Sequence, residues 1–125
     1  MKYSVRHEYI QDDTILLRTF KGSLSLLDIA HCIDDDVNQG RIHSGLIGVI
    51  NDYLDSNIKV EIDDLDNVLA AFDKHEDVLI PMKWAVIVDF SLAAVPSIFR
   101  EKNPKYNLQS FTEFSSALRW VEGVS

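Results

Sequence analysis

With 125 residues, of which 46% are hydrophobic and 26% charged, the chain has the size and composition of one globular domain, which excludes the disordered and fibrous classes. Acidic residues outnumber basic ones 20 to 12, and a formal net charge of -8 repels nucleic-acid backbones and anionic lipid headgroups. The only cysteine is Cys32, so no intrachain disulfide can form, and no apolar run approaches the roughly 20 residues of a membrane span. We therefore expect a single cytoplasmic domain over residues 1–125, without a nucleic-acid partner.

The N-terminal third predicts a β-hairpin followed by a helix. Residues 3–10 alternate apolar and polar side chains, as a half-buried strand does, and residues 14–21 form a second strand that ends at Gly22. Ser25 and Asp28 have the spacing of a capping box, which predicts a helix beginning directly after Ser25. Apolar residues then recur at helical spacing, at Leu26, Ala30, Ile33 and Val37.

The middle of the chain predicts a buried strand, a short edge strand and a helix. Residues 46–50 are continuously apolar, which is typical of a strand buried on both faces. Ile58, Val60 and Ile62 alternate with charged residues, which predicts either a short, separate, exposed edge or an extended lead-in. Asp63 or Asp64 can cap the helix that follows, whose apolar residues keep the helical spacing.

The C-terminal third predicts two strands, each followed by a helix. Residues 83–88 form the second continuously apolar strand. Pro96 suits the first position of a helix that extends to Lys102, because deeper in a helix it would break the hydrogen-bond ladder. Residues 106–111 form the last strand, and Thr112 caps a final helix that Gly123 ends.

The order β-β-α-β-α-β-α-β-α predicts an α/β domain. Strands joined through a helix run parallel, whereas a hairpin is antiparallel. We therefore expect a mixed, mostly parallel five-stranded sheet with an N-terminal antiparallel hairpin and four helices.

This element order resembles the SpoIIAA-like group of the STAS superfamily over nearly the whole chain. The segments that carry the resemblance are residues 22–29, 49–52, 83–88 and 111–121. The resemblance implies a bacterial, non-enzymatic domain, similar to CRAL-TRIO lipid-exchange domains, that holds an apolar ligand or contacts a membrane. It also implies an alternative, a partner-switching regulator phosphorylated on serine. Ser56 is the candidate phosphoacceptor, although Asp55-Ser56-Asn57-Ile58 lacks the glycine of the family's Asp-Ser-Ser-Gly-like turn.

The candidate site lies where the two buried strands end. In an open α/β sheet, ligands bind at the carboxyl ends of parallel strands. The segment after the second buried strand is too apolar for a solvated loop; it either packs on the neighbouring helices or covers a hydrophobic pocket. The residues expected to form an apolar crevice are Tyr53, Leu54, Phe90, Leu92, Val95 and Ile98. The expected occupant is a small lipophilic ligand, a membrane surface or a protein partner.

Other candidate sites are weaker. Asp52, Asp55 and Asp89 could hold Mg²⁺ for an enzymatic reaction, but no lysine stands at the end of the last strand, as receiver-type phosphoryl sites require. The four histidines form no zinc-binding pair, so we expect no metal or other cofactor. Residues 34–36, three consecutive aspartates, are expected to be solvated acidic surface. A local basic spot that could contact a membrane is expected at Lys83, Arg100, Lys102 and Lys105.

Overall fold

The computed structural model describes residues 2–124 and contains five strands and five α-helices. The strands are β1 (Tyr3–Ile10), β2 (Ile15–Ser25), β3 (Gly48–Lys59), β4 (Lys83–Ile87) and β5 (Asn107–Phe111). The α-helices are α1 (Leu26–Asn38), α2 (Leu65–Lys74), α3 (Glu76–Leu79), α4 (Ala94–Lys102) and α5 (Phe114–Glu122). Two short 3-10 turns, η1 (Ile62–Asp64) and η2 (Phe90–Leu92), precede α2 and α4.

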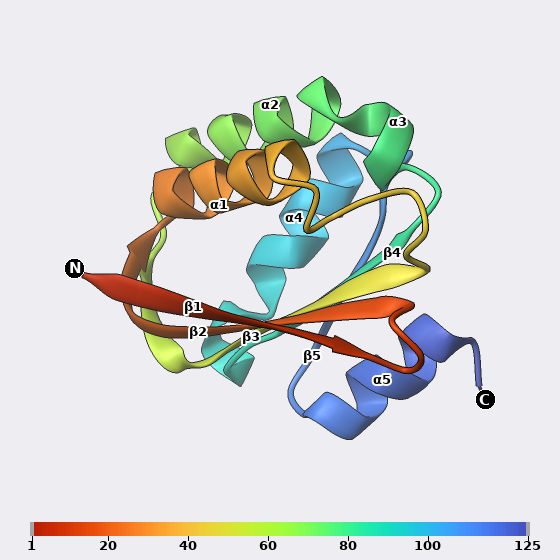
Figure 1. The fold of residues 1–125 in the computed structure, drawn as a ribbon. Helices are drawn as coiled ribbons and strands as arrows, with labels where there is room; N and C mark the ends of the chain where they lie inside the picture. The colour runs from red at the N-terminus through yellow and green to blue at the C-terminus, as the bar shows by residue number, and fades with distance from the viewer. Residues whose placement is uncertain (1, 125) are drawn as a thin grey trace.

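The strands form one sheet in the order β1-β2-β3-β4-β5. β1 pairs with β2 in antiparallel fashion, and all the other pairs are parallel, which confirms the predicted mixed α/β sheet. The two apolar central strands, β3 and β4, lie side by side and point the same way. Helices α1 to α4 cover one face of the sheet and α5 lies on the other (Figure 1).

The first helix begins where the capping-box spacing predicts. The backbone N–H of Asp28 donates to the Ser25 hydroxyl at 3.1 Å, and the backbone N–H of Ser25 donates to the Asp28 carboxylate at 2.9 Å. Two amides that have no partner inside the helix are thereby satisfied. The apolar stripe of α1 then packs on the sheet, with Leu26, Ala30 and Ile33 buried.

The prediction that residues 58–62 form a separate edge is wrong, because β3 continues to Lys59. β2 also continues past Gly22 to Ser25, and the two extended strands remain paired up to Ser25 and Lys59. Thr19 of β2 pairs with Asp52 of β3, and Lys21 pairs with Asp55, so β3 has one extra residue in this interval. Such an extra residue is a β-bulge. The bulge leaves two consecutive side chains of β3, Leu54 and Asp55, exposed, and so keeps both Tyr53 and Ile58 on the helix-covered face.

Two predicted helix boundaries are also shifted, and a third predicted cap makes no side-chain hydrogen bond. α4 begins at Ala94, so Pro96 is its third residue; this is tolerated because the first-turn N–H groups have no acceptor within a helix. Glu113 rather than Thr112 is the N-cap residue of α5. Asp64 occupies the N-cap position of α2, but its side chain makes no capping hydrogen bond.

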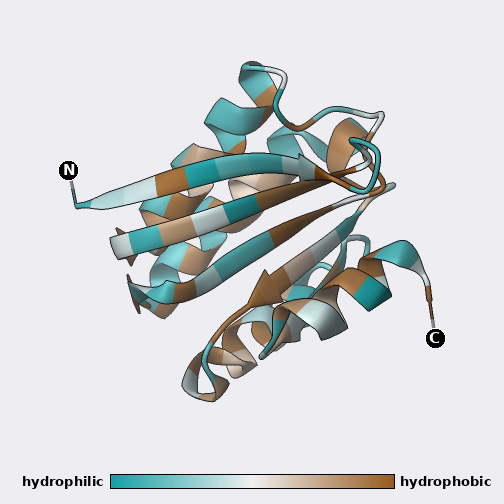
Figure 2. Cartoon of the chain, turned by 60° about the horizontal axis from the view of Figure 1, so that its bottom comes forward, coloured by the Kyte–Doolittle hydropathy of each residue, from teal (hydrophilic) through white to brown (hydrophobic). Residues whose placement is uncertain are grey.

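The sheet separates two hydrophobic clusters. The larger lies under α1, α2 and α4 and includes a group of aromatic rings in which Phe72 contacts Trp84, Phe99 and Tyr106 at centroid distances of 4.9–5.0 Å. The smaller lies between the sheet and α5. Helix α5 contacts β3, β4 and β5, and on this face most of β1 and β2 has no helix over it (Figure 2). The exception is the hairpin end, where Ile15 is buried in the cluster under α5.

Candidate functional site

An apolar cavity of about 80 Å³ lies between the sheet and helices α1, α2 and α4. Its floor is formed by side chains of β3, β4 and β5 on the helix-covered face, and its roof by the three helices. The lining residues are apolar side chains and one tyrosine, namely Leu26, Ile29, Ile33, Tyr53, Ile58, Val60, Leu65, Val68, Phe72, Trp84, Val86, Val88, Leu92, Val95, Pro96, Phe99 and Leu108. Such a lining offers a water molecule few polar partners.

Three of the six residues predicted to form the crevice line this cavity. Tyr53, Leu92 and Val95 are among its walls. Burial raises the pKa of the Tyr53 hydroxyl to about 12, so this side chain is neutral at physiological pH.

The other three predicted crevice residues lie outside the cavity. Ile98 is half-buried and packs against the large core cluster, but it is not among the lining residues. Leu54 is 46% exposed, and strand alternation places it with Ile50, on the face that α5 covers. Phe90, in η2, is 85% exposed, an unusual position for so large an apolar side chain.

The segment from η2 through α4 covers the cavity with few polar contacts to the sheet. The Ser110 hydroxyl donates to the carbonyl oxygen of Ala93 at 3.5 Å, and Arg100 Nη1 donates to the carbonyl oxygen of Leu108 at 3.4 Å. Both distances are at the long end for hydrogen bonds. The segment is therefore held mainly by apolar packing of side chains such as Pro96 and Phe99.

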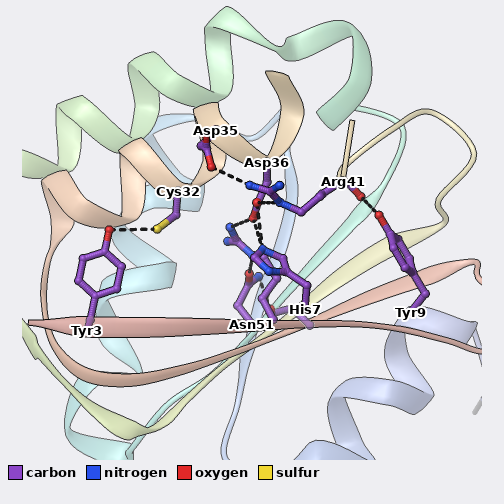
Figure 3. Close-up of polar contacts among 10 residues, drawn as sticks. Tyr3, His7, Tyr9, Cys32, Asp35, Asp36, Arg41 and Asn51 are labelled. Carbon is purple, nitrogen blue, oxygen red and sulfur yellow. Dashed lines mark hydrogen bonds and ion pairs between the residues drawn. The ribbon is translucent and has the colours of Figure 1, made fainter. Parts of the chain in front are cut away.

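A second, polar site lies beneath α1, and sequence reasoning missed it. Asp36 is only 2% exposed, and its carboxylate accepts hydrogen bonds from Arg18 Nη1 at 2.9 Å and from Arg41 Nε at 2.7 Å. His7 Nε2 lies 2.9 Å from the same carboxylate. Figure 3 shows these side chains converging from β1, the C-terminal part of α1 and the loop after it. The expectation that Asp36 would be solvated is wrong.

Arg18 supplies the buried positive charge of this network. The side chain is fully buried, its Nε donates to the Asn51 amide oxygen at 2.7 Å, and its guanidinium lies 5.1 Å from the ring centroids of both Phe20 and Trp84. Burial alone would raise the pKa of Asp36, but the charge of Arg18 and the hydrogen bonds from Arg41, Arg18 and His7 hold it below its usual value. The Asp36 carboxylate is therefore ionised at neutral pH.

The sequence contains a signal for this network. In β2, Leu16, Arg18 and Phe20 occupy alternate positions, so an arginine stands on the buried face of a strand. In α1, Asp36 follows Ile33 by three residues and therefore lies beside the apolar stripe. A charged residue on each of two facing apolar surfaces indicates a buried ion pair.

The predicted phosphoacceptor lies within a strand. Ser56 is a half-buried residue of β3 that pairs with Gly22 of β2, and its hydroxyl donates to the carbonyl oxygen of Tyr53 at 2.7 Å. It therefore stands just beyond the bulge in β3. The serine is not at a helix N-terminus, where backbone N–H groups would favour a phosphate.

The acidic candidates form no metal-binding group in the described chain, and the basic candidates are engaged in local contacts. Within residues 2–124, no group of three or more His, Cys, Asp or Glu side chains could hold a metal ion. In the predicted basic spot, Lys102 pairs with Asp66, and Lys105 pairs with both Asp73 and Glu76. Lys83 donates to the Trp120 carbonyl oxygen near α5. None of the helices in the described part of the chain is long and apolar enough to cross a membrane.

Comparison with known proteins identifies the fold. No protein-family model matches the chain, and no curated protein matches it in sequence. Among solved structures, an uncharacterized DUF3478-family protein with a SpoIIAA-like fold from Shewanella loihica PV-4 is 18% identical, with a TM-score of 0.63, over 95% of this chain and 93% of that one. An anti-sigma factor antagonist from Mycobacterium paratuberculosis is 13% identical, with a TM-score of 0.60, over 96% and 94% of the two chains.

The anti-sigma factor antagonist SpoIIAA in its unphosphorylated form is also similar. It is 13% identical, with a TM-score of 0.54, over 97% of this chain and all of that one. The chain therefore has the SpoIIAA-like fold, as the sequence resemblance predicts.

Proposed function

We propose that this SpoIIAA-like domain is a non-enzymatic binding module that takes a small lipophilic group into the cavity under α1, α2 and α4. The observation that carries the proposal is the cavity itself, which lies in the larger of the two cores and is lined almost entirely by apolar side chains. An apolar ligand gains free energy there by leaving water, at roughly 25 cal/mol per Å² of apolar surface buried. The few polar groups in the wall favour hydrocarbon over a polar metabolite.

The size of the cavity limits what binds without rearrangement. A volume of about 80 Å³ is roughly half of the 150 Å³ that holds benzene in an engineered cavity of another protein. A short or branched aliphatic group therefore fits directly, whereas a longer chain has to displace part of the roof. The η2–α4 segment is the roof element best suited to move, because only long hydrogen bonds tie it to β5.

A membrane surface is a less favourable partner than a free ligand. Phe90 is well exposed and could insert into lipid, but two lysines of the predicted basic spot, Lys102 and Lys105, pair with acidic residues of α2 and α3. The net charge of -8 also repels anionic headgroups. Binding to vesicles of anionic lipid should therefore be weak.

Tryptophan fluorescence offers a direct assay. Trp84 lines the cavity, whereas Trp120 belongs to α5 and packs against the smaller cluster on the other face, so Trp120→Phe leaves Trp84 as the only tryptophan. Titration with dodecanoate should then shift the emission of Trp84 saturably. Absence of any saturable change with millimolar dodecanoate and also with a short branched alcohol such as 2-methylpropanol, which fits without movement of the roof, would overturn the proposal.

A matched pair of α4 variants tests the location. Val95→Phe fills the cavity from α4 and should weaken dodecanoate binding by about tenfold or more, equivalent to at least 1.4 kcal/mol. Ile98→Phe makes the same kind of enlargement three residues away, at a residue outside the cavity wall, and should leave binding nearly unchanged. Equal effects of the two variants would place the ligand elsewhere.

A second candidate function is a protein-binding regulator phosphorylated on Ser56. The fold similarity to two anti-sigma factor antagonists favours it. Phosphorylation at this position would have to break the hydrogen bond from Ser56 to the Tyr53 carbonyl and expose a half-buried side chain. Incubation with cell extract and ATP, followed by mass-spectrometric mapping, tests the idea, and a chain without phosphate on Ser56 would eliminate this mechanism.

A further inference from the structure

The outer edge of β1 has no partner strand within the described chain. β1 is the first strand of the sheet order and pairs only with β2. Its eight residues, Tyr3–Ile10, contain no proline or glycine, and its register with β2 has no bulge. Proline and β-bulges are among the features that protect sheet edges from pairing, and this edge has neither, although it carries the charged residues Arg6 and Glu8.

The backbone groups that face outward can be assigned from the pairing with β2. The N–H of Ser23 donates to the carbonyl oxygen of Lys2 at 2.8 Å, so residue 2 directs its backbone groups toward β2. N–H and C=O groups alternate in direction along an antiparallel strand. The backbone groups of Tyr3, Val5, His7 and Tyr9 therefore point away from β2, toward the open edge.

We propose that this edge is a homodimer interface, at which β1 pairs in antiparallel fashion with β1 of a second copy to form one ten-stranded sheet. In such a symmetric pair, the two copies are related by a two-fold axis perpendicular to the sheet, and this rotation leaves each side chain on the same face of the sheet. Odd-numbered and even-numbered residues of β1 lie on opposite faces, and paired residues of an antiparallel sheet lie on the same face. Paired residues must therefore both be odd-numbered or both be even-numbered. Two registers satisfy this condition with seven paired residues in each strand, one centred on Arg6 and one centred on His7.

Charge selects between the two registers. With the axis at Arg6, the two arginines face each other, and like charges directly opposite are destabilising. With the axis at His7, Arg6 of each copy faces Glu8 of the other, on the sheet face that has no helix over β1. Arg6 and Glu8 of one chain lie 3.9 Å apart in a surface ion pair, but their side chains are 75% and 55% exposed, so each can exchange this contact for one with the other copy.

The remaining pairs of the His7-centred register are also compatible. Val5 of each copy faces Tyr9 of the other on the helix-covered side, an aliphatic–aromatic pair that favours sheet formation. The outward-facing groups of Val5, His7 and Tyr9 supply the backbone hydrogen bonds. His7 itself lies on the axis, where its imidazole is bound to Asp36 of its own chain.

The test exchanges the charges of Arg6 and Glu8 and measures whether the chain is a monomer or a dimer. The full-length chain is analysed by sedimentation velocity from about 1 µM to 1 mM, at an ionic strength of about 150 mM, where long-range repulsion between the copies is screened. The wild-type chain should form a dimer. Arg6→Glu and Glu8→Arg should each raise the dimer dissociation constant by about tenfold or more, because each variant places like charges opposite one another twice. The double variant should restore dimerisation.

The two single variants separate a local effect from one of net charge. Arg6→Glu makes the chain more negative and Glu8→Arg makes it less negative, so a general repulsion between copies would weaken one dimer and strengthen the other. Lys59→Glu and Glu61→Lys exchange a similarly exposed ion pair elsewhere on the surface and should leave dimerisation unchanged. A monomeric wild type at 1 mM, or a double variant that does not recover, would refute the proposal.

Discussion

Replacing Asp36 by asparagine tests the claim that a buried ion pair joins α1 to the sheet. The carboxylate accepts hydrogen bonds from Arg18 at 2.9 Å and from Arg41 at 2.7 Å, and the variant places an N–H₂ group against at least one of these donors. Arg18 is fully buried, so its charge cannot find water instead. Removing one partner of a buried pair costs about 3–5 kcal/mol.

That loss is large for a domain of this size. Total stabilities of about 5–15 kcal/mol are usual, so Asp36→Asn should leave the fold marginal. With an unfolding entropy of about 0.26 kcal/mol/K for 125 residues, the expected fall in Tm is about 12–20 °C. Urea unfolding followed by far-UV circular dichroism measures the free-energy difference, and differential scanning calorimetry measures the Tm.

Two controls make the measurement specific. Asp35→Asn removes the neighbouring carboxylate, which is 62% exposed and pairs with Arg41 at the surface, and should cost no more than about 0.5 kcal/mol. Arg18→Met combined with Asp36→Leu removes both charges and should recover much of the lost stability. If Asp36→Asn costs less than about 1 kcal/mol, the pair does not hold α1 on the sheet.

Three further predictions concern stability. The folded state lowers the pKa of Asp34, Asp36 and Asp73 below its usual value. Their ionised forms therefore stabilise the folded state above about pH 4, and this part of the free energy of unfolding is lost as the pH falls through the lowered pKa values. Urea unfolding at pH 7, 4 and 3 should show the decline in the free energy of unfolding. Gly48→Ala should cost about 1–3 kcal/mol in the same assay, because its Cβ would lie 2.6 Å from a β4 carbonyl oxygen; a neutral result would contradict this packing. Ser25→Ala removes the capping box of α1 and should lower the free energy of unfolding by about 0.5–2 kcal/mol. An unchanged urea midpoint would contradict this.

The sequence predicts the order of elements because each depends on neighbouring residues. The alternation in residues 3–10, the capping box at Ser25 and Asp28, and the apolar runs that become β3 and β4 are local patterns. Parallel pairing of β3 with β4 then follows from the helical connection between them. Because β3 and β4 are parallel neighbours, the segments that follow their apolar runs lie at the same end of the sheet. Half of the predicted crevice residues therefore meet in the cavity, namely Tyr53, Leu92 and Val95.

Contacts between distant segments decide the rest. The bulge in β3 depends on pairing with β2 and reverses the alternation, so the face on which Ile58 lies could not be assigned by counting from Tyr53. Asp36 belongs to an acidic run that is otherwise typical of surface, and its burial depends on Arg18, 18 residues earlier, and on the loop that carries Arg41. Local residue pattern thus determined which segments form strands and helices. Only the packing of those segments decided which charges are buried, because a charge can leave water only where the fold supplies its partner.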